Sequence, residues 1–524
     1  NYCLLHRTLY MMHWLIFMAL TVGSRFFYRF VSTLPFKRSA KGTARRLMIV
    51  GAGWAGANVI RDIKNGRYGN AQAVLAVDDN PSVAGSKLNG VKVLKDTASI
   101  PQYAAEYAID DIIIAIATPN GDLRKLIEAC LSTGCRVRRV TSLEDVSRKG
   151  TQSDVRDLNI ADLLGRSETS LNMTPVAAYF AGKTVLITGG GGSIGSELCR
   201  QILAFQPHKV VLYDINENYM YDLFAELKHT YGDTLKDLLI LRVGSVRDGA
   251  RLDDVMDEFA FDVLLHAAAH KHVPMLEDSP VQAVKNNVFG TYVTAGRAIA
   301  HGIKRFVFIS TDKAVNPTNI MGTTKRMAEM VIAALGSGSD TEFVSVRFGN
   351  VLGSHGSVVP LFERQIRAGG PITVMHPDIV RYFMTIPEAA SLVLQAAVLA
   401  KGGELFVLDM GQPVLIRELA ERMLQLYAAQ GGQNQVEIVY TGLRPGEKLY
   451  EELLTDDENL VKTELEKIYV TKPDSITEAQ LQTMLQTLQD CIDTHGDIRA
   501  CMHRLVPTFR EPKEVNGSAA ELKQ

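Results

Sequence analysis

A glycine-rich segment, residues 183–200, constrains the fold of this chain more than any other stretch. Val185–Ile187 predicts a short strand that is buried on both faces, and a helix is expected from Ser196 onward. Between them, the pattern T-G-x-x-G-x-x-G places glycines at Gly189, Gly192 and Gly195. A strand, a glycine turn and a helix bring bare backbone N–H groups to a helix N-terminus, where a pyrophosphate can bind. The next predicted strand, Val210–Asp214, ends in an acid placed to bind a ribose diol, so the segment indicates a dinucleotide site rather than a loop that merely packs.

A second segment of the same kind lies nearer the N-terminus. Arg46–Val50 is a strand-like run, G-x-G-x-x-G follows at residues 51–56, and Val74–Asp79 predicts a strand with acids at its end. Later strands are predicted at Ile112–Ala117 and Val137–Val140. These elements predict a first Rossmann-like domain. No catalytic residues follow its strands, which favours a structural or regulatory role, and whether it binds a nucleotide stays open.

The main α/β domain is expected to begin near Ala181. Helical stretches alternate with its strands, which predicts a doubly wound parallel sheet. The predicted strands are Thr184–Thr188, Val210–Asp214, Leu239–Val243, Val263–Ala267, Arg305–Ser310 and Phe343–Arg347. The predicted fold class is therefore α/β, with two Rossmann-like doubly wound parallel-sheet domains preceded by the end of a transmembrane segment. The expected units are a membrane segment with a basic stretch at 1–45, the first domain at 46–145, a linker at 146–180, a catalytic domain with a substrate-binding C-terminal part at 181–505, and a polar tail at 506–524.

The N-terminal end departs from the globular pattern. Thr8–Ser24 contains no Asp, Glu, Lys or Arg and is about 17 residues long, the lower limit for a membrane span. Basic residues without an acid among them follow, at Arg25, Arg29, Lys37, Arg38, Lys41, Arg45 and Arg46. Such a flank indicates that the rest of the chain stays in the cytoplasm. We expect attachment to the inner, cytoplasmic membrane with the catalytic domains facing the cytoplasm, and a signal peptide or a buried soluble helix are the alternatives.

Composition excludes two classes of function. A formal net charge of −2 gives no basic field for nucleic acid. The six cysteines are scattered, and Cys130 and Cys135, the closest pair, have no C-x-x-C spacing or histidine partner. We therefore expect reduced thiols and no metal site.

The acid and the small residues near the glycine segment indicate which dinucleotide would bind. No Arg follows Asp214, so its carboxylate favours the free 2′-hydroxyl of NAD and repels a 2′-phosphate. His266 and then Ala267–Ala269 close the fourth predicted strand, and these small residues let a cofactor lie against the backbone. Asn287, on the next predicted helix, is either a ligand contact or a buried hydrogen-bonding residue.

The stretch most informative about chemistry is Ile309–Ala314. The strand before it is apolar, so Thr311, Asp312 and Lys313 lie at its C-terminal end, where open α/β sheets bind ligands. Lys325 lies in a helix that begins nearby. A carboxyl group beside an ammonium, next to a nicotinamide, suits an acid–base elimination, whereas a surface pair would mean little.

Six ordered motifs together resemble the extended short-chain dehydrogenase/reductases, and within them the membrane-bound polysaccharide-biosynthesis proteins that are UDP-N-acetylglucosamine 4,6-dehydratases. The motifs are T-G-x-x-G-x-x-G, Ala268-Ala-His-Lys-His-Val-Pro-Met-Leu-Glu277, Ser310-Thr-Asp-Lys-Ala314, Arg347-Phe-Gly-Asn-Val-Leu-Gly353, Arg381-Tyr-Phe-Met-Thr385 and Arg444-Pro-Gly-Glu-Lys448. The resemblance covers nearly the whole chain. It implies an internal redox elimination in which the sugar is oxidised at C4, water is lost across C5 and C6, and C6 is reduced, with NAD regenerated in each turnover.

The resemblance also implies roles for individual residues. Asp312 would be the acid at C6, and Lys313 the base at C5. Thr311 would hydrogen-bond the C4 oxygen, and Lys325 would bind the nicotinamide ribose. The implied cofactor contacts are Gly189, Gly192, Ser193, Ile194, Gly195, Asp214, Ser245, Val246, Ala267, Ala268, Ala269 and Lys325. The implied substrate contacts are Lys271, His272, Asn287, Arg347, Asn350, Arg381, Arg444 and Glu447.

Two departures from the wider superfamily matter. A Tyr usually stands four residues before the Lys as the base at the C4 hydroxyl, but here that place is Met321, and a thioether cannot take a proton. The C4 proton must therefore leave by Thr311, Asp312 or water. Ser245 stands where many relatives have an Asp beside the adenine. A lysine base must be neutral, so Lys313 would need a pKa well below its usual value of about 10.4.

The expected function is thus NAD-dependent 4,6-dehydration of UDP-N-acetylglucosamine, or of a related UDP-sugar, for surface glycan or glycoprotein synthesis. A UDP-sugar 4-epimerase shares fold and cofactor but needs no acid at C6. A non-catalytic nucleotide-sensing membrane protein is the rival from another class, and the intact Asp312, Lys313 and Lys325 argue against it. We also expect a homo-oligomer.

Overall fold

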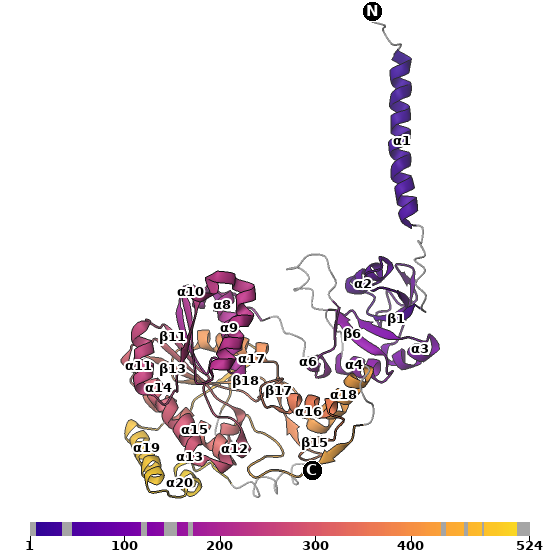
Figure 1. Cartoon of the computed structure of the whole chain (residues 1–524). Helices are drawn as coiled ribbons and strands as arrows, with labels where there is room; N and C mark the ends of the chain where they lie inside the picture. Colours follow the sequence, from indigo (N-terminus) through magenta and orange to yellow (C-terminus); the bar gives the residue numbers. More distant parts are fainter. Residues whose placement is uncertain are drawn as a thin grey trace, which may run out of the picture.

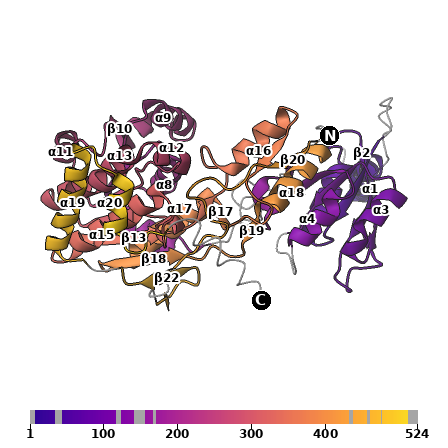
Figure 2. The same cartoon turned by 90° about the horizontal axis from the view of Figure 1, so that it is seen from below.

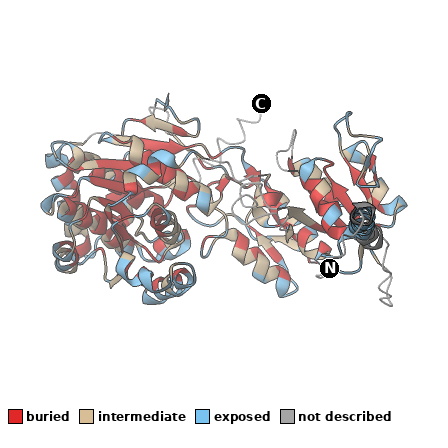
Figure 3. Cartoon of the chain, turned by 90° about the horizontal axis from the view of Figure 1, so that it is seen from above, coloured by how far each residue is buried: buried red, intermediate tan, exposed pale blue. Residues whose placement is uncertain are grey.

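Two α/β domains and a separate N-terminal helix make up the chain (Figure 1). The computed structural model describes residues 7–33, 44–116, 123–140, 155–165, 171–430, 436–454, 459–473 and 476–510. In both domains the strands are the most buried elements, and the outer helices carry the exposed faces (Figure 3). This burial follows from the apolar runs that predicted the strands.

The first domain contains a seven-stranded sheet in the order β3-β4-β2-β1-β5-β6-β7. Strands β1, β2, β4, β5 and β6 are parallel, and the short β3 and β7 pair antiparallel at the two edges. The strands are β1 (Arg45–Val50), β2 (Ala71–Val77), β3 (Lys87–Leu88), β4 (Val91–Leu94), β5 (Asp111–Ile114), β6 (Arg136–Val140) and β7 (Val155–Asp157). The helices are α2 (Trp54–Lys64), α3 (Ile100–Glu106), α4 (Leu123–Leu131) and α6 (Ile160–Leu163). The predicted Rossmann-like domain is confirmed, with its edge strands added.

The second domain contains a nine-stranded sheet in the order β10-β9-β8-β11-β12-β13-β18-β22-β21. The order in which successive strands are added to the sheet reverses between β8 and β11. Ligands of such sheets bind at the point where the strand order reverses. The strands are β8 (Thr184–Thr188), β9 (Lys209–Asp214), β10 (Leu239–Val243), β11 (Val263–His266), β12 (Arg305–Ile309), β13 (Glu342–Arg347), β18 (Glu404–Leu408), β21 (Val461–Lys462) and β22 (Ile468–Thr471). Each of the six predicted strands is confirmed to within one residue at either end, and the last three were not predicted.

Helices cover both faces of this sheet. They are α7 (Thr174–Phe180), α8 (Ser193–Ala204), α9 (Glu217–Tyr231), α10 (Leu235–Leu238), α11 (Gly249–Glu258), α12 (Val273–Asp278), α13 (Pro280–Ala283), α14 (Gly290–Ala300), α15 (Ile320–Gly336), α17 (Ile386–Leu399), α19 (Glu478–Asp493) and α20 (Ile498–Leu505). Short helical turns lie at η1 (Thr97–Ser99) in the first domain and at η2 (Gly232–Thr234), η3 (Val284–Phe289) and η4 (Asp312–Ala314) in the second. Of these, η3 is a π-helical turn between α13 and α14.

A smaller lobe of the second domain packs against the first domain. Its helices are α16 (Val358–Arg367) and α18 (Ile416–Ala429), and its strands are β14 (Asn350–Val351), β15 (Ile372–Val374), β16 (Val380–Arg381), β17 (Phe383–Met384), β19 (Val414–Leu415) and β20 (Ile438–Tyr440). Figure 2 shows α16 and α18 between the two sheets. One hydrophobic cluster runs through Met48 and Leu163 of the first domain and Phe362 and Met423 of the lobe. The first domain is therefore joined to the second through a shared core.

The predicted linker, residues 146–180, was expected to pack on its neighbours, and its described parts form regular elements that do so. Residues 155–165 form β7 and α6 and complete the first domain. Helix α7 packs against the large sheet, with Val176 and Phe180 almost fully buried. The predicted polar tail also begins too early, since Val506 and Phe509 are buried against α19 and α20. Residues 146–154, 166–170 and 511–524 lie outside the described residues.

Helix α1 (Arg7–Thr33) stands apart from both domains (Figure 1). Large apolar side chains along it are exposed, among them Trp14, Phe17 and Leu20. Over the residues that the structure describes, no helix combines the length and the apolar character needed to cross a bilayer, so the predicted transmembrane segment is not supported. The predicted basic residues Lys37, Arg38 and Lys41 lie outside the described part of the chain.

Candidate active site

The glycine loop between β8 and α8 has the geometry that its sequence predicts. Gly189 has a φ of +68°, and a Cβ there would lie 2.6 Å from the backbone nitrogen of Ala268. A Cβ at Gly195 would lie 2.2 Å from the Gly189 carbonyl oxygen. Both positions therefore require glycine. The loop opens onto the N-terminus of α8 at Ser193 and Ile194, where exposed N–H groups favour an anion.

Asp214 is tied to the glycine loop. The N–H of Gly191 donates to its Oδ2 at 2.9 Å, and the N–H of Asn216 donates to its Oδ1 at 2.9 Å. These bonds fix a carboxylate beside the loop, at the end of β9. The loop, this acid and the small Ala267–Ala269 fit a dinucleotide whose adenosine ribose has free hydroxyls, as NAD does.

Ser245 and Val246, the two predicted contacts with the adenine, lie in different environments. The carbonyl of Ser245 accepts a 2.9 Å bond from the Tyr213 hydroxyl, and its Oγ accepts from the N–H of Arg247. Val246 is buried in the core beneath it. Ser245 therefore already bonds to the protein.

A cavity of 720 Å³ joins the glycine loop to the predicted catalytic residues. It runs from the N-terminus of α8 to the C-terminal end of β12 and the first turns of α15. Predicted residues that line it are Gly189, Gly192, Ser193, Ile194, Gly195, Ala267, Ala269, Lys271, His272, Thr311, Lys313, Met321, Lys325 and Asn350. Two polar atoms of its lining residues, Asn350 Oδ1 and Ser357 Oγ, are buried without a hydrogen-bond partner in the described structure, which points to a polar ligand.

Thr311, Asp312 and Lys313 form one hydrogen-bonded unit at the end of β12. The Thr311 hydroxyl donates to Asp312 Oδ1 at 2.8 Å, and Lys313 Nζ lies 3.1 Å from the same oxygen. The Oδ2 atom of Asp312 is buried and has no partner within the part of the chain that the structure describes. Thr311 and Lys313 line the cavity, and Asp312 lies directly behind them.

The charge on Lys313 differs from the expectation. Burial alone would lower its pKa, but the carboxylates of Asp312 and Glu451 outweigh burial and raise the pKa above its usual value. The requirement for a pKa well below 10.4 is therefore not met in this arrangement. Lys313 is held as an ammonium.

Lys325 shows the opposite behaviour. Its Nζ donates to the Ile309 carbonyl at 2.6 Å and lies 3.9 Å from the centre of the Phe308 ring. Burial lowers its pKa to about 7, against a smaller opposing effect of Glu329. Met321 lies one helical turn earlier on α15 and lines the cavity, so the thioether occupies the place predicted for it.

A short segment after β14 closes over the glycine loop. The His355 N–H donates to Ser193 Oγ at 3.2 Å, and the His355 ring stacks on Tyr219 with 4.8 Å between ring centroids. A Cβ at Gly356 would lie 2.4 Å from the ring of His272. His355 and Tyr219 were not predicted as site residues. The only sequence signal was the glycine and serine content of this loop.

Two residues predicted as substrate contacts, Asn287 and Arg347, bind other protein groups in this structure, and their contact with the substrate stays a prediction. Asn287 accepts from the His270 N–H at 2.8 Å and donates to the His270 carbonyl and to Thr324, so it braces the loop after β11. Arg347 is fully buried and binds the carboxylate of Glu329 through two nitrogens, at 3.1 and 2.8 Å. Burial alone would raise the pKa of Glu329, but Arg347, together with Arg326 and Ser310, outweighs burial and lowers the pKa to about 2.

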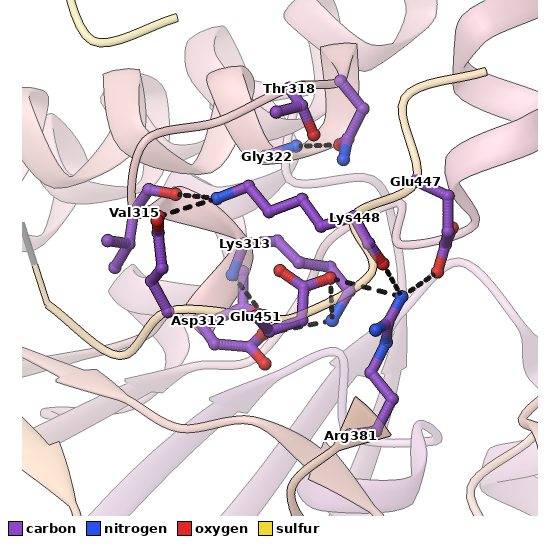
Figure 4. Close-up of polar contacts among 12 residues, drawn as sticks. Asp312, Lys313, Val315, Thr318, Gly322, Arg381, Glu447, Lys448 and Glu451 are labelled. Carbon is purple, nitrogen blue, oxygen red and sulfur yellow. Dashed lines mark hydrogen bonds and ion pairs between the residues drawn. The ribbon is translucent and has the colours of Figure 1, made fainter. Parts of the chain in front are cut away.

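Arg381 and Glu447 also bind each other rather than lining the cavity. Arg381 Nη2 lies 2.5 Å from Glu447 Oε1, and Arg381 is 4% exposed (Figure 4). Their predicted contacts with the diphosphate and the uridine ribose are not available in this arrangement. Arg444, by contrast, is exposed, and its predicted role stays open.

His266, the last residue of β11, is buried. Its two ring nitrogens contact the hydroxyls of Thr188 and Thr291, at 2.7 and 3.1 Å. Burial, with a smaller contribution from Lys325, lowers the pKa of His266 to about 3. A neutral imidazole therefore links β8, β11 and α14 beneath the cavity.

Comparison with known proteins decides the family. The family described as polysaccharide biosynthesis protein matches residues 185–473. This chain belongs to that family. Among its relatives, the capsular polysaccharide biosynthesis protein CapD of Staphylococcus aureus is 42% identical over 92% of this chain and 80% of its own length.

More distant relatives of this polysaccharide biosynthesis protein are nucleotide-sugar enzymes. A UDP-N-acetylglucosamine 4,6-dehydratase (inverting) of Campylobacter jejuni is 30% identical over 56% of this chain and 84% of its own. A UDP-glucose 4-epimerase of Rickettsia canadensis is 32% identical over 54% and 81%. The X-ray structure of Pen from Bacillus thuringiensis is 33% identical, with a TM-score of 0.51, over 59% of this chain and 99% of that one. The chain is thus a nucleotide-sugar-modifying enzyme of the extended short-chain dehydrogenase/reductase kind.

Proposed function

We propose that the enzyme is an NAD-dependent 4,6-dehydratase of UDP-N-acetylglucosamine. The observation that carries this proposal is the Asp312–Lys313 pair at the cavity that the glycine loop also lines. An acid is needed at C6 only if a hydroxyl leaves there. The 4,6-dehydratase among the relatives supports the same reaction.

NAD, when bound at the glycine loop, supplies the reversible oxidation of the sugar. Gly189, Ser193 and Ile194 would hold its pyrophosphate, Asp214 its adenosine ribose and Lys325 its nicotinamide ribose. Because Asp214 carries a charge that repels a 2′-phosphate, protein denatured after purification should release NAD(H). Recovery of mainly NADP(H) would contradict this assignment.

Thr311 and Asp312 replace the missing tyrosine as the route for the C4 proton. The hydrogen bond from the Thr311 hydroxyl to Asp312 Oδ1 connects a cavity-lining group to a buried carboxylate. Asp312 takes the C4 proton as the ketone forms and then gives it to the departing C6 hydroxyl, which leaves as water. Met321 takes no part in proton transfer.

Lys313 takes the C5 proton and later returns it to the same carbon. Since the surrounding carboxylates keep Lys313 charged, it must first lose one proton to the solvent. The rate should therefore rise with pH.

The alternative reaction with the most similar chemistry is 4-epimerisation. The UDP-glucose 4-epimerase among the relatives supports this alternative. Dehydration removes one water from the sugar, whereas epimerisation leaves its mass unchanged. Mass and NMR spectra of the product from UDP-N-acetylglucosamine separate the two reactions. A product of unchanged mass would refute the proposal, and the absence of any turnover would favour a non-catalytic role.

Location and assembly are proposed separately. The exposed Trp14, Phe17 and Leu20 on α1 support attachment to the cytoplasmic membrane, with both domains on its inner face. Flotation of the full chain with vesicles of bacterial lipid, compared with a variant that begins at residue 41, tests the attachment. The homo-oligomer stays a prediction, which sedimentation analysis would check.

A further inference from the structure

A buried charge cluster lies behind the cavity wall at Lys313. Figure 4 shows the Glu451 carboxylate between the side chains of Lys313 and Arg381. Its Oε1 is 3.7 Å from Lys313 Nζ and 3.7 Å from Arg381 Nη2. Glu451 is 8% exposed and is not among the residues that line the cavity.

The cluster has defined partners on every side. Lys313 faces Asp312 on its own turn, η4, and Glu451, Glu447 and Arg381 from the neighbouring elements. Burial would raise the pKa of Glu451, but Lys313, Arg381 and Lys448 together lower it, so this carboxylate stays charged. A charged group at this depth is stable only with such partners.

The segment that carries Glu451 is itself clamped to the catalytic elements. The carbonyl of Gly446 accepts from the Thr318 hydroxyl and the Asn319 side chain, at 2.8 and 3.0 Å. Lys448 Nζ donates to the Val315 carbonyl at 3.0 Å (Figure 4). These contacts hold Glu451 against η4 and the start of α15, although it is more than 130 residues away in the chain.

We propose that Glu451 is a positioning residue that shares the Lys313 ammonium with Asp312 and so sets where, and in which charge state, Lys313 meets the sugar. This inference rests on the proposed function. Asp312 Oδ1 and Glu451 Oε1 both lie close to the ammonium, at 3.1 and 3.7 Å, so the two carboxylates hold it together.

The neighbouring acid provides a matched control. Glu452 lies next to Glu451 on the same segment, but its carboxylate binds Lys448 at 3.0 Å and Asn316 at 3.1 Å rather than Lys313. Its side chain is 39% exposed. Glu452→Gln therefore changes the charge of the segment without touching Lys313.

The experiment follows kcat and KM over a pH series for wild type, Glu451→Gln, Glu451→Asp and Glu452→Gln. Removing an opposite charge at this distance should move the rise of kcat with pH to lower pH by about 1–3 pH units in Glu451→Gln. KM should change little, because Glu451 lies outside the cavity lining. Glu451→Asp, whose carboxylate is one methylene shorter, should shift in the same direction by less, and it carries the test if Glu451→Gln does not fold.

A merely structural role would lower kcat equally at all pH values or raise KM. That result, or an equal shift in Glu452→Gln, would overturn the inference. Trace acetylation of Lys313 with acetic anhydride over the same pH series, read by mass spectrometry without substrate, gives a second measurement. It should show Lys313 reacting at lower pH in Glu451→Gln than in wild type, and it tests Glu451 even if the sugar proves to be a different one.

Discussion

Protonated Lys325 should lower the free energy of unfolding of the protein. The size of this loss should depend on pH. Its pKa falls from 10.5 to about 7 on folding, mainly through burial. One pKa unit corresponds to about 1.4 kcal/mol, so a protonated Lys325 lowers the free energy of unfolding by roughly 5 kcal/mol. Since the folded pKa is the lower one, this cost is full below about pH 7. It shrinks between pH 7 and 10.5, and it is absent above 10.5.

Lys325→Met removes the charge and keeps the side-chain volume. The variant also loses the hydrogen bond to the Ile309 carbonyl, which offsets about 1–3 kcal/mol. At about pH 6.5 the variant should therefore be more stable than wild type by roughly 2–4 kcal/mol. Above pH 7 this difference should fall by about 1.4 kcal/mol per pH unit.

Urea denaturation of the cofactor-free protein, followed by far-UV circular dichroism at several pH values, measures the difference. Lys228→Met serves as the control, since Lys228 is exposed on α9 and should give no pH-dependent difference. A difference between Lys325→Met and wild type that does not vary with pH would refute the reasoning. So would a wild type that is the more stable protein at pH 6.5.

Three further predictions concern the cavity. Asp312→Asn should lower kcat by about 10²–10⁴-fold, while Met321→Ala should keep substantial activity, as single-turnover kinetics would show; equal loss in both would contradict their roles. Gly195→Ala should abolish cofactor retention because its Cβ meets the loop carbonyl, whereas Gly53→Ala, which meets nothing within 4 Å, should leave turnover intact, as activity and bound cofactor would report. His355→Ala should release the cofactor about tenfold faster, because it loses the ring stacking on Tyr219 and the 3.1 Å contact between His355 Nδ1 and Ser193 Oγ, and stopped-flow exchange measures this rate.

The predicted and observed strand bounds agree where a short stretch of sequence determines the strand. β8 and β10 match their predicted bounds, because each is an apolar run closed by glycine or polar residues. β18 and β22 were missed. β22 pairs antiparallel with β18 at the edge of the parallel sheet, and no short pattern in the sequence reports a pairing between residues 404 and 471.

The joined core of the two domains was unpredictable for a similar reason. α18 shows an ordinary amphipathic pattern, which does not identify the surface it covers. In the structure it packs on α4 and α6 of the first domain, and Arg422 lies 2.6 Å from Glu128. Residues of the first domain thus pack against the lobe that carries Asn350 of the cavity lining, and the predicted structural or regulatory role of that domain stays a prediction.

The arginines of the motifs show that residue type alone does not identify the group that an arginine binds. A guanidinium binds a phosphate and a carboxylate equally well. Residue type therefore made Arg347 and Arg381 candidates for binding the diphosphate. In the folded chain each is buried against a glutamate, and removing such a group from its partner leaves an uncompensated charge that costs several kcal/mol. Neither guanidinium is among the groups that line the cavity. Among the described residues that line the cavity the cations are lysines, including Lys271 and Lys313, whereas the buried arginines do not line it and the predicted role of the exposed Arg444 stays open.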